Sequence, residues 1–375
     1  MSGRNKISFV TVVSIIGAYA AYGIGSGFAT GQEILQYFAS WGPKGLVPAI
    51  LGSAFIMGVS FLALVHDGFA HNSEFVKDSD CYTYYCGEYF GSFLDLFSIL
   101  LVLSVYIAVF AGCGATINQY FHVSALTGTV IMGIIVAVVV MLGLKRIVQI
   151  LGCLGVIFII YTVCFGTYCM IASGQPLSQA GAHIPEYIEQ GKILQISTLD
   201  IRNPFWAGLN YGGVNLIVAV PFLLALGRGT RSRAEAAIGG AGAGIVFMVP
   251  VLFSAITILL NIDYIAEYGQ QVPSLAAINN MLPSISWAYL VILILGVFST
   301  LTGYTWLITD RFTKEGTSQS RVLCIAIVFI GIIAGGYLPF NVILNRIFPI
   351  AGIMGMLLTL MIIIRKVRDL LKAKR

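Results

Sequence analysis

Two glycine-rich stretches contain the residues whose types and spacing could do chemistry. In the first, Tyr22-Gly23-Ile24-Gly25-Ser26-Gly27, glycine takes alternate positions inside an apolar segment. Such a run weakens a helix by several kcal/mol, and glycine tolerates non-helical backbone. We therefore expect a helix break here, with Ser26 or Thr30 capping a restarted helix.

The second stretch, Asn210-Tyr211-Gly212-Gly213-Val214-Asn215, has the same character and is followed by Pro221. We expect a second break here. Glycine also serves close packing of membrane helices, and for either stretch alone that alternative stays open. Two interrupted helices at the starts of two inverted halves are, however, typical of a central solute site.

The ends of broken helices define the expected chemistry. A restarted helix after Gly25 would present free N–H groups to an anionic group, and carbonyls freed around Gly23 and Tyr211 would suit a cation. A zwitterion such as an amino acid would satisfy both. The predicted solute contacts are Gly23, Gly25, Ser26, Gly27, Asn210, Tyr211, Gly212, Gly213 and Asn215.

The composition places these stretches in a membrane. Of the 375 residues, 58% are hydrophobic and only 10% are charged, whereas soluble proteins carry about 25% charged residues. The basic residues form short clusters between apolar runs and no continuous face, which excludes nucleic acid as a partner. We expect one all-α transmembrane domain over residues 1–375, with the lipid bilayer around it.

Apolar segments long enough to cross a bilayer recur along the chain. We place ten of them, at 8–40, 46–70, 93–120, 125–144, 147–173, 204–227, 234–262, 285–310, 322–340 and 343–366. Five crossings per half would make residues 8–173 and 204–366, approximately, inverted repeats. The first and sixth segments carry the two predicted breaks.

Lys and Arg cluster at both termini and in the loops after the fourth, sixth and eighth segments. These clusters share one side of the membrane when the number of crossings is even. We therefore expect both termini on the cytoplasmic side of the inner membrane. The loop between the second and third segments is an acidic exception, with Asp67 at its start.

The stretch at 17–38, with Gly23-Ile24-Gly25-Ser26-Gly27-Phe28-Ala29-Thr30-Gly31-Gln32-Glu33, resembles the first helix of the amino acid–polyamine–organocation superfamily. More narrowly, it resembles the bacterial YkvI-like membrane proteins. The whole chain is similar to the five-plus-five LeuT fold, in which helices one and six are discontinuous. The resemblance implies a secondary transporter that works by alternating access.

The resemblance also implies a sodium site between the first break, at Tyr22, and hydroxyls of the eighth segment. Ser299 and Thr300, or Thr302, supply those hydroxyls here. The fifth segment has no Lys of the kind that some proton-coupled relatives use, which favours sodium. The alternative is that the hydroxyls bond their own helix backbone. Tyr106 matches a solute-binding tyrosine of relatives, or is an ordinary packed aromatic.

Relatives close their gates with ion pairs, for which the chain offers Glu33 with Arg346 outside and Arg4 with Asp310 inside. Glu33 lies about two turns beyond the first break and is costly there unless paired or wet. It is alternatively a solvated vestibule carboxylate, the carrier of a coupling proton, or the partner of a cationic solute. Arg4 is alternatively a positive flank.

The chain has no phosphate-binding loop and no Ser/His/Asp or Cys/His constellation, so we expect neither an enzyme nor a cofactor other than a coupling sodium ion. The leading interpretation is a sodium-coupled symporter of an amino acid or similar zwitterion. The alternatives are a proton-coupled transporter of a related solute, a non-transporting receptor on a transporter scaffold, and a channel. The identity of the solute and the oligomeric state stay open.

Overall fold

The structure is a computed structural model of the whole chain and describes residues 7–24, 26–71, 75, 79–141, 145–269, 271–314, 316–338 and 340–373. Within these ranges the regular structure is helical, apart from one isolated bridge between Thr198 and Ile201. The long helices are α1 (Phe9–Gly23), α4 (Gly42–Ala70), α6 (Glu88–Phe121), α7 (Ala125–Met141), α8 (Lys145–Ala172), α10 (Pro204–Arg228), α11 (Arg233–Val246), α12 (Met248–Leu260), α15 (Ser286–Phe312), α16 (Ser318–Tyr337) and α17 (Phe340–Ala373). The short ones are α2 (Ser26–Thr30), α3 (Gln32–Tyr37), α5 (Ser79–Cys86), α9 (Ile184–Glu189), α13 (Ile262–Tyr268), α14 (Pro273–Met281) and the single turns η1 (Ala39–Trp41), η2 (Leu177–Gln179) and η3 (Pro283–Ile285).

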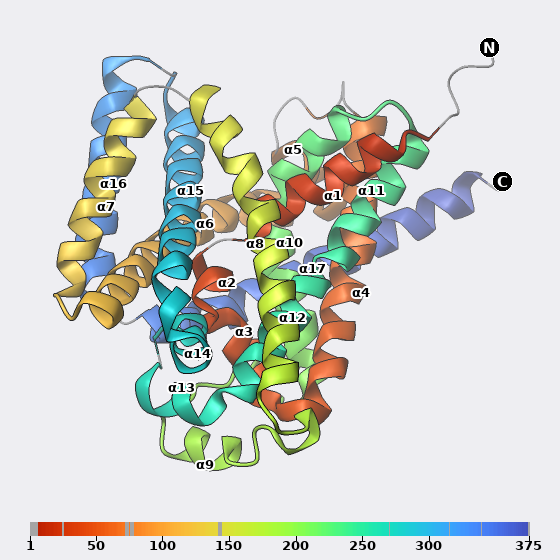
Figure 1. Cartoon of the computed structure of the whole chain (residues 1–375). Coiled ribbons are helices and arrows are strands. Elements are labelled where there is room, and N and C mark those ends of the chain that lie inside the picture. Colours follow the sequence, from red (N-terminus) through yellow and green to blue (C-terminus); the bar gives the residue numbers. More distant parts are fainter. Residues whose placement is uncertain are drawn as a thin grey trace.

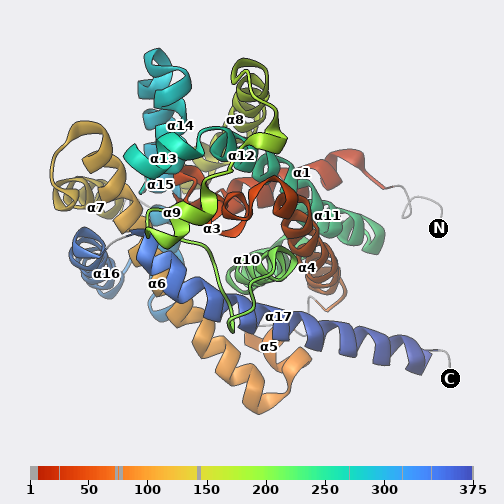
Figure 2. The ribbon, with the colours of Figure 1, turned by 90° about the horizontal axis from the view of Figure 1, so that it is seen from below.

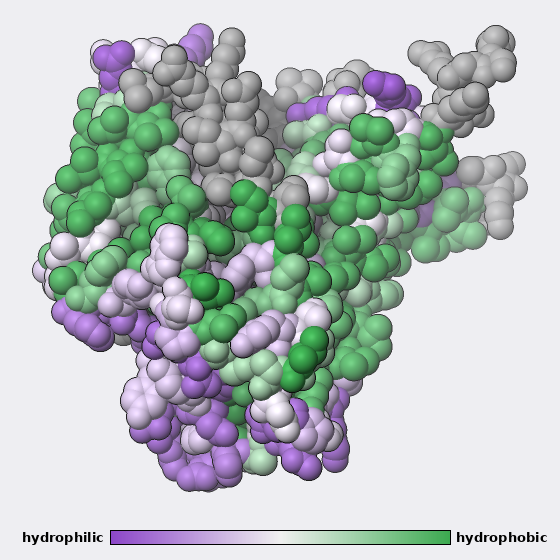
Figure 3. Space-filling model, viewed as in Figure 1, coloured by the Kyte–Doolittle hydropathy of each residue, from purple (hydrophilic) through white to green (hydrophobic). Residues whose placement is uncertain are grey.

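Each of the ten predicted apolar segments corresponds to one long helix or to a group of consecutive helices. Seven helical stretches of the described chain are long and apolar enough to cross a membrane, and three shorter apolar helices accompany them. In chain order the ten segments are α1 to α3, α4, α6, α7, α8, α10, α11 with α12, α15, α16 and α17. Figure 3 shows hydrophobic residues in a broad zone between hydrophilic ends. The prediction of an all-α, multi-pass membrane protein is confirmed.

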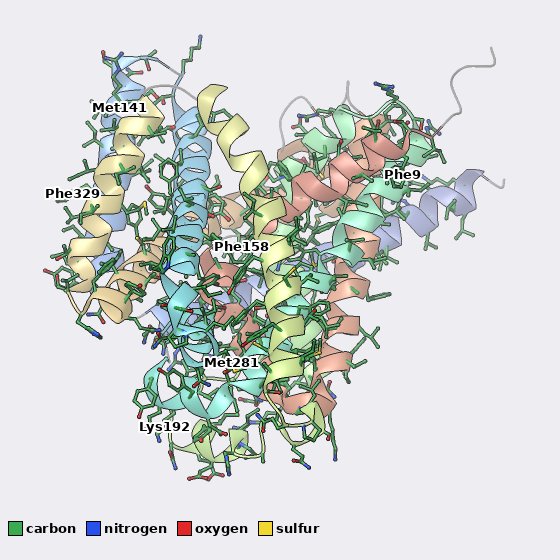
Figure 4. All side chains as sticks on the ribbon, in the orientation of Figure 1. Phe9, Met141, Phe158, Lys192, Met281 and Phe329 are labelled. Atoms are coloured by element: carbon green, nitrogen blue, oxygen red, sulfur yellow. The ribbon has the colours of Figure 1, made fainter. Side chains whose placement is uncertain are left out.

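The two ends of the molecule differ in what they carry. The start of α1 and the end of α17 lie on the same side, whereas α9, α13 and α14 cover the opposite end (Figure 1). Phe9 and Lys192 mark these two ends in Figure 4. This placement agrees with an even number of crossings, while the assignment of one end to the cytoplasm stays a prediction.

The contacts between helices follow a two-fold pattern in chain order. The helix α4 packs on α10 as α1 packs on α11, α6 packs on α7 as α15 packs on α16, and α8 packs on α1 as α17 packs on α10. If the ten segments are numbered in chain order and each segment of a pair is replaced by the segment five positions earlier or later, the resulting pair is also in contact. The helices form two groups, with α6, α7, α15 and α16 on the left of Figure 1 and α1, α4, α10 and α11 on the right.

The first segment is broken, as predicted. Helix α1 ends at Gly23, Ile24 has non-helical backbone angles (φ −81°, ψ 73°), and α2 begins at Ser26. A second interruption follows at Gly31, whose φ of 82° favours glycine. The Thr30 hydroxyl accepts a hydrogen bond from the N–H of Gln32 at 3.4 Å, but the N-cap of α3 is Gly31 and not Thr30. Gly25 lies outside the described residues.

The predicted break in the sixth segment is wrong, because α10 runs as one helix from Pro204 to Arg228. The glycines of this helix let neighbouring backbones approach. A Cβ on Gly212 would lie 2.8 Å from Cβ of Ile56, and a Cβ on Gly213 would lie 2.2 Å from the Gly352 carbonyl oxygen. The packing alternative therefore holds for this stretch.

Pro221 does not break α10 either. Its missing N–H leaves the carbonyl of Ile217 without its helical donor. The hydroxyl of Tyr82 donates to that carbonyl at 3.4 Å, and the hydroxyl of Tyr22 donates to the next one, of Val218, at 2.9 Å. Side chains from α5 and α1 thus compensate the polar groups that the proline exposes.

A buried ion pair joins three helices at the end that holds the termini. The carboxylate of Asp67, on α4, is fully buried, accepts a hydrogen bond from the Tyr85 hydroxyl of α5, and pairs with the Lys366 ammonium of α17. From the sequence we expect Asp67 at the start of the acidic loop, whereas the structure places it in the last turn of α4. The basic C-terminal helix neutralises it.

We predict that Asp67→Asn lowers the free energy of unfolding by about 3 kcal/mol, the lower end of the range for buried pairs, because Lys366 loses the fully buried carboxylate that pairs with it. The measurement is the melting temperature of the detergent-purified protein. The matched control is Asp369→Asn, which removes a pair with Arg365 at 3.6 Å whose carboxylate is partly exposed and should cost less than about 1 kcal/mol. Equal effects of the two variants would contradict the structural role of Asp67.

Candidate functional site

A cavity lies where the break in the first segment meets α6, α10, α15 and α17. Its empty volume is about 570 Å³ with the mouth included. Figure 2 shows α3, α10 and α17 close together around this region. The lining residues are Tyr22, Gly23, Gly27, Glu33, Val105, Ala108, Val109, Val214, Asn215, Val218, Thr300, Tyr304, Phe340, Leu344 and Phe348.

The cavity brings together only part of the predicted site. Among the predicted residues, Tyr22, Gly23, Gly27, Glu33, Asn215 and Thr300 line it. Eight others lie outside the lining, namely Tyr106, Asn210, Tyr211, Gly212, Gly213, Ser299, Thr302 and Arg346. Gly25 and Arg4 are not among the described residues, and the side chains of Ser26 and Asp310 are not described. The inner Arg4–Asp310 pair therefore stays a prediction.

Asn210 positions helices and does not face the cavity. It is fully buried, its Oδ1 accepts a hydrogen bond from the Tyr37 hydroxyl at 2.9 Å, and its Nδ2 donates to the Pro349 carbonyl at 2.9 Å. These bonds join α10 to α3 and α17. An amide with both ends satisfied in this way has little capacity left for a solute.

Tyr106 is a packed aromatic. Its hydroxyl shares a 2.8 Å hydrogen bond with the Thr305 hydroxyl of α15, and its ring packs edge-on against Phe110. The face of α6 that meets the cavity is instead the apolar one of Val105 and Val109. Tyr106 therefore lies outside the cavity lining, and its contact with a solute stays a prediction.

Glu33 places a carboxylate in the cavity, directly against the first turn of α2. A Cβ on Gly27 would lie 1.6 Å from Oε1 of Glu33, so only glycine leaves room for the carboxylate. An anionic group of the solute was expected beside this turn. The protein's own carboxylate lies there instead, and α2 has only five residues, too few to build up the macrodipole of a long helix.

Four tyrosines, Tyr19, Tyr37, Tyr211 and Tyr304, lie within electrostatic reach of Glu33, and a fifth, Tyr22, lines the same cavity. Three of these five hydroxyls donate elsewhere. Tyr19 donates to Oδ1 of Asn215 at 3.2 Å, and Tyr22 and Tyr37 bond Val218 and Asn210 as described above.

The remaining two hydroxyls, of Tyr211 and Tyr304, lie within electrostatic reach of the Glu33 carboxylate. The buried hydroxyl of Tyr211 has no partner at full hydrogen-bond geometry in the described part of the chain, and it lies in range to donate to the Glu33 carboxylate. Glu33 is therefore surrounded by neutral phenols, and no Lys, Arg or His of the described chain forms an ion pair with it.

The outer gate residues predicted from the sequence do not meet. Arg346 is exposed and forms no ion pair with Glu33. A neutral hydrogen-bond network lies beyond Glu33 instead, and we name it the amide clasp (Gln36, Gln195, Asn341 and Asn345).

In the amide clasp, the buried Gln36 of α3 accepts a hydrogen bond from Nδ2 of Asn345 at 3.0 Å and donates to the Asn341 carbonyl at 3.0 Å. Asn345 also donates to the Gln195 carbonyl at 3.3 Å, and Gln195 donates to the Ser40 carbonyl at 2.8 Å. The segment between α9 and α10 is thus fastened over α3 and the start of α17.

The hydroxyls expected to hold sodium mainly bond their own helix. Thr300 donates to the Gly296 carbonyl at 3.1 Å, and Thr302 donates to the Phe298 carbonyl at 2.7 Å. Thr300 nevertheless faces the cavity, as does Tyr22. No cluster of three or more His, Cys, Asp or Glu side chains that could hold a metal occurs in the described ranges. Sodium binding therefore stays a prediction.

Sequence reasoning missed several lining residues that helical spacing could have revealed. Tyr304 lies four residues after Thr300 and shares its helix face. Phe340, Leu344 and Phe348 follow one another at spacings of four on α17 and line the cavity together. The amide clasp gave no comparable signal, because neutral amides in loops and at helix ends are common.

Neither a protein-family model nor a curated protein matches the chain. Among solved structures it is similar to mutant forms of the manganese transporter of Eremococcus coleocola, with a TM-score of 0.49 and 16% identity over 94% of this chain and 71% of that one. The same transporter in complex with an aromatic bis-isothiourea substituted compound gives a TM-score of 0.48 and 16% identity over 92% and 70% of the two chains. At this level of similarity neither solute nor mechanism transfers to this chain.

We predict that Gly213→Ala destabilises the protein by about 1–3 kcal/mol, because its new Cβ would meet the backbone of α17. The matched control is Gly303→Ala on α15, where a Cβ would have no neighbour within 4 Å, so the melting temperature should stay or rise. A Gly213→Ala protein as stable as the parent would restore the idea of a flexible break in α10.

Proposed function

We propose that the protein is a secondary active transporter that moves a small solute by alternating access, with the cavity as the solute site. The observation that supports this best is a carboxylate-bearing cavity at the break of a membrane helix. Broken backbone at membrane depth is tolerated only where it lines a cavity or is buried in protein. Here Gly23 and Gly27, on the two sides of the break, both line the cavity.

The two-fold pattern of helix contacts supports the second part of the proposal, that residues 8–173 and 204–366 form inverted repeats of one domain. Equivalent contacts allow two arrangements of similar energy, in which one helix group rocks against the other around the cavity. The protein would lie in the inner membrane of the cell. With an even number of crossings and the positive clusters on one side, both termini would lie on the cytoplasmic side of that membrane.

The present arrangement has the character of a state closed to the outside. Helix α2 packs on α6, α14 and α15, and α3 packs on α14 and α17. The amide clasp adds hydrogen bonds between α3, α17 and the segment before α10. We propose that this clasp, in place of the Glu33–Arg346 pair, is the outer gate.

The driving ion has two candidates that the cavity supports. The hydroxyl oxygens of Tyr22 and Thr300 line the cavity and keep lone pairs for a sodium ion, whereas Glu33 is a group that can carry a proton. The sodium-coupled symport expected from the resemblance is thus one form of the proposal, and proton coupling at Glu33 is the other.

We predict gradient-driven accumulation of labelled solute, drawn from a panel of amino acids and amines, in proteoliposomes containing the full chain. An imposed sodium gradient and an imposed pH gradient, applied separately, identify the drive. Glu33→Gln should reduce accumulation at least about tenfold, the cost of one charge contact. The control is Glu189→Gln, an exposed residue at the end of α9, which should transport normally. Flux that ignored both gradients would indicate a channel, and binding without flux would indicate a receptor.

We predict that Asn345→Ala opens the outer side more often, because it removes two hydrogen bonds of the amide clasp, each contributing about 1 kcal/mol. In a Leu344→Cys background, labelling of the cavity cysteine by a membrane-impermeant thiol reagent from outside should become about 5- to 30-fold faster. Arg346→Ala is the control and should leave the rate unchanged. If Arg346→Ala increased the labelling rate more than Asn345→Ala, the Glu33–Arg346 ion pair would be the outer gate and the amide clasp would not.

A further inference from the structure

The described part of the cavity lining has an acidic side chain and no basic one. Among the fifteen described residues of the lining, Glu33 alone has a side chain that can carry a charge at neutral pH, and none of the fifteen is Lys, Arg or His. The five tyrosines around it are neutral, and three of them donate their hydroxyl protons to Asn215, Val218 and Asn210. A carboxylate at membrane depth is costly without a cation or a proton. Glu33 is therefore stabilised either by a proton or by a cation that enters the cavity.

The position of Glu33 also limits what a solute can carry. Its carboxylate fills the space beside Gly27, where an anionic group would approach the broken backbone. A second carboxylate there would face a like charge in surroundings of low dielectric constant. The zwitterion expected from the sequence fits this arrangement poorly, because the protein supplies the negative group itself.

The rest of the lining matches an organic cation better than a metal ion. Tyr22 and Tyr304 line the same cavity as the carboxylate, and aromatic rings attract ammonium groups. Apolar side chains from α6, α10 and α17, such as Val109, Val218 and Leu344, form the opposite walls. A divalent ion needs several oxygen ligands of high charge, whereas the lining has one carboxylate.

We propose that Glu33 is the counter-charge for a small primary amine with an apolar body, and that the solute needs no carboxylate. This inference rests on the proposed function, because it takes the cavity as the transport site. It narrows the proposed solute to amines, in place of the zwitterion expected from the sequence. Gly27 and the neutral tyrosines are the features that keep the carboxylate free for this role.

The test compares ligands that differ only in a carboxylate. We would measure affinities for the detergent-purified full chain by thermal shift and calorimetry with 2-phenylethylamine against phenylalanine, and with isoamylamine against leucine. Each amine should bind at least about tenfold more tightly than its amino acid. Glu33→Gln, which keeps the size of the side chain, should weaken amine binding about 30-fold or more. Glu189→Gln should bind like the parent.

Two outcomes would overturn the inference. The first is an amino acid that binds as tightly as its amine, and the second is a folded Glu33→Gln protein that binds amines unchanged. If Glu33→Gln fails to fold, the ligand pairs on the unaltered protein still decide. Amine binding without flux in proteoliposomes would contradict the proposed function and leave the inference standing. Gradient-driven flux of amino acids but not of amines would support the proposed function and contradict the inference.

Discussion

The structure depends on one constraint, a carboxylate inside a predicted membrane segment that pairs with no basic side chain among the described residues. Glu33 lies against Gly27, and its carboxylate fits only because the chain has no side chain at that position. The same break in the first segment that makes this room also opens the cavity. Removing a charge from water without a partner is unfavourable. The Glu33 carboxylate therefore depends on the cavity, on the surrounding phenols and on a bound cation or proton together.

The surrounding helices provide the rigidity that this arrangement needs. Asn210 fastens α10 to α3 and α17 on one side of the cavity, and the amide clasp fastens α3 to α17 at its outer end. At the other end of the molecule, the Asp67–Lys366 pair holds α4 to α17. These contacts are neutral or internally compensated, which leaves Glu33 as the uncompensated charge of the lining. Such an asymmetry is what a site for a cationic solute requires.

Much of the fold could be predicted from hydropathy alone, because a span of apolar residues has few other places to go. The break at Gly23–Gly27 was also predictable, since alternate glycines weaken a helix locally. The break expected at Asn210–Asn215 was wrong for a reason that lies outside the stretch. Gly212 and Gly213 meet Ile56 and Gly352, from distant segments, and a one-dimensional pattern cannot distinguish a glycine that frees the backbone from one that admits a neighbour.

The candidate site was predictable where the cost of burial shows in the sequence. Glu33 stands out because it interrupts an apolar run, whereas Tyr304 and the amide clasp carry no such signal and depend on which helix faces meet. The most direct test is an experimental map of the protein in lipid nanodiscs with 2-phenylethylamine. The account predicts a broken first segment and ligand density in the cavity, with its nitrogen within about 4 Å of the Glu33 carboxylate. A continuous helix through residues 23–27, or a ligand bound elsewhere with Glu33 paired to a basic side chain, would contradict it.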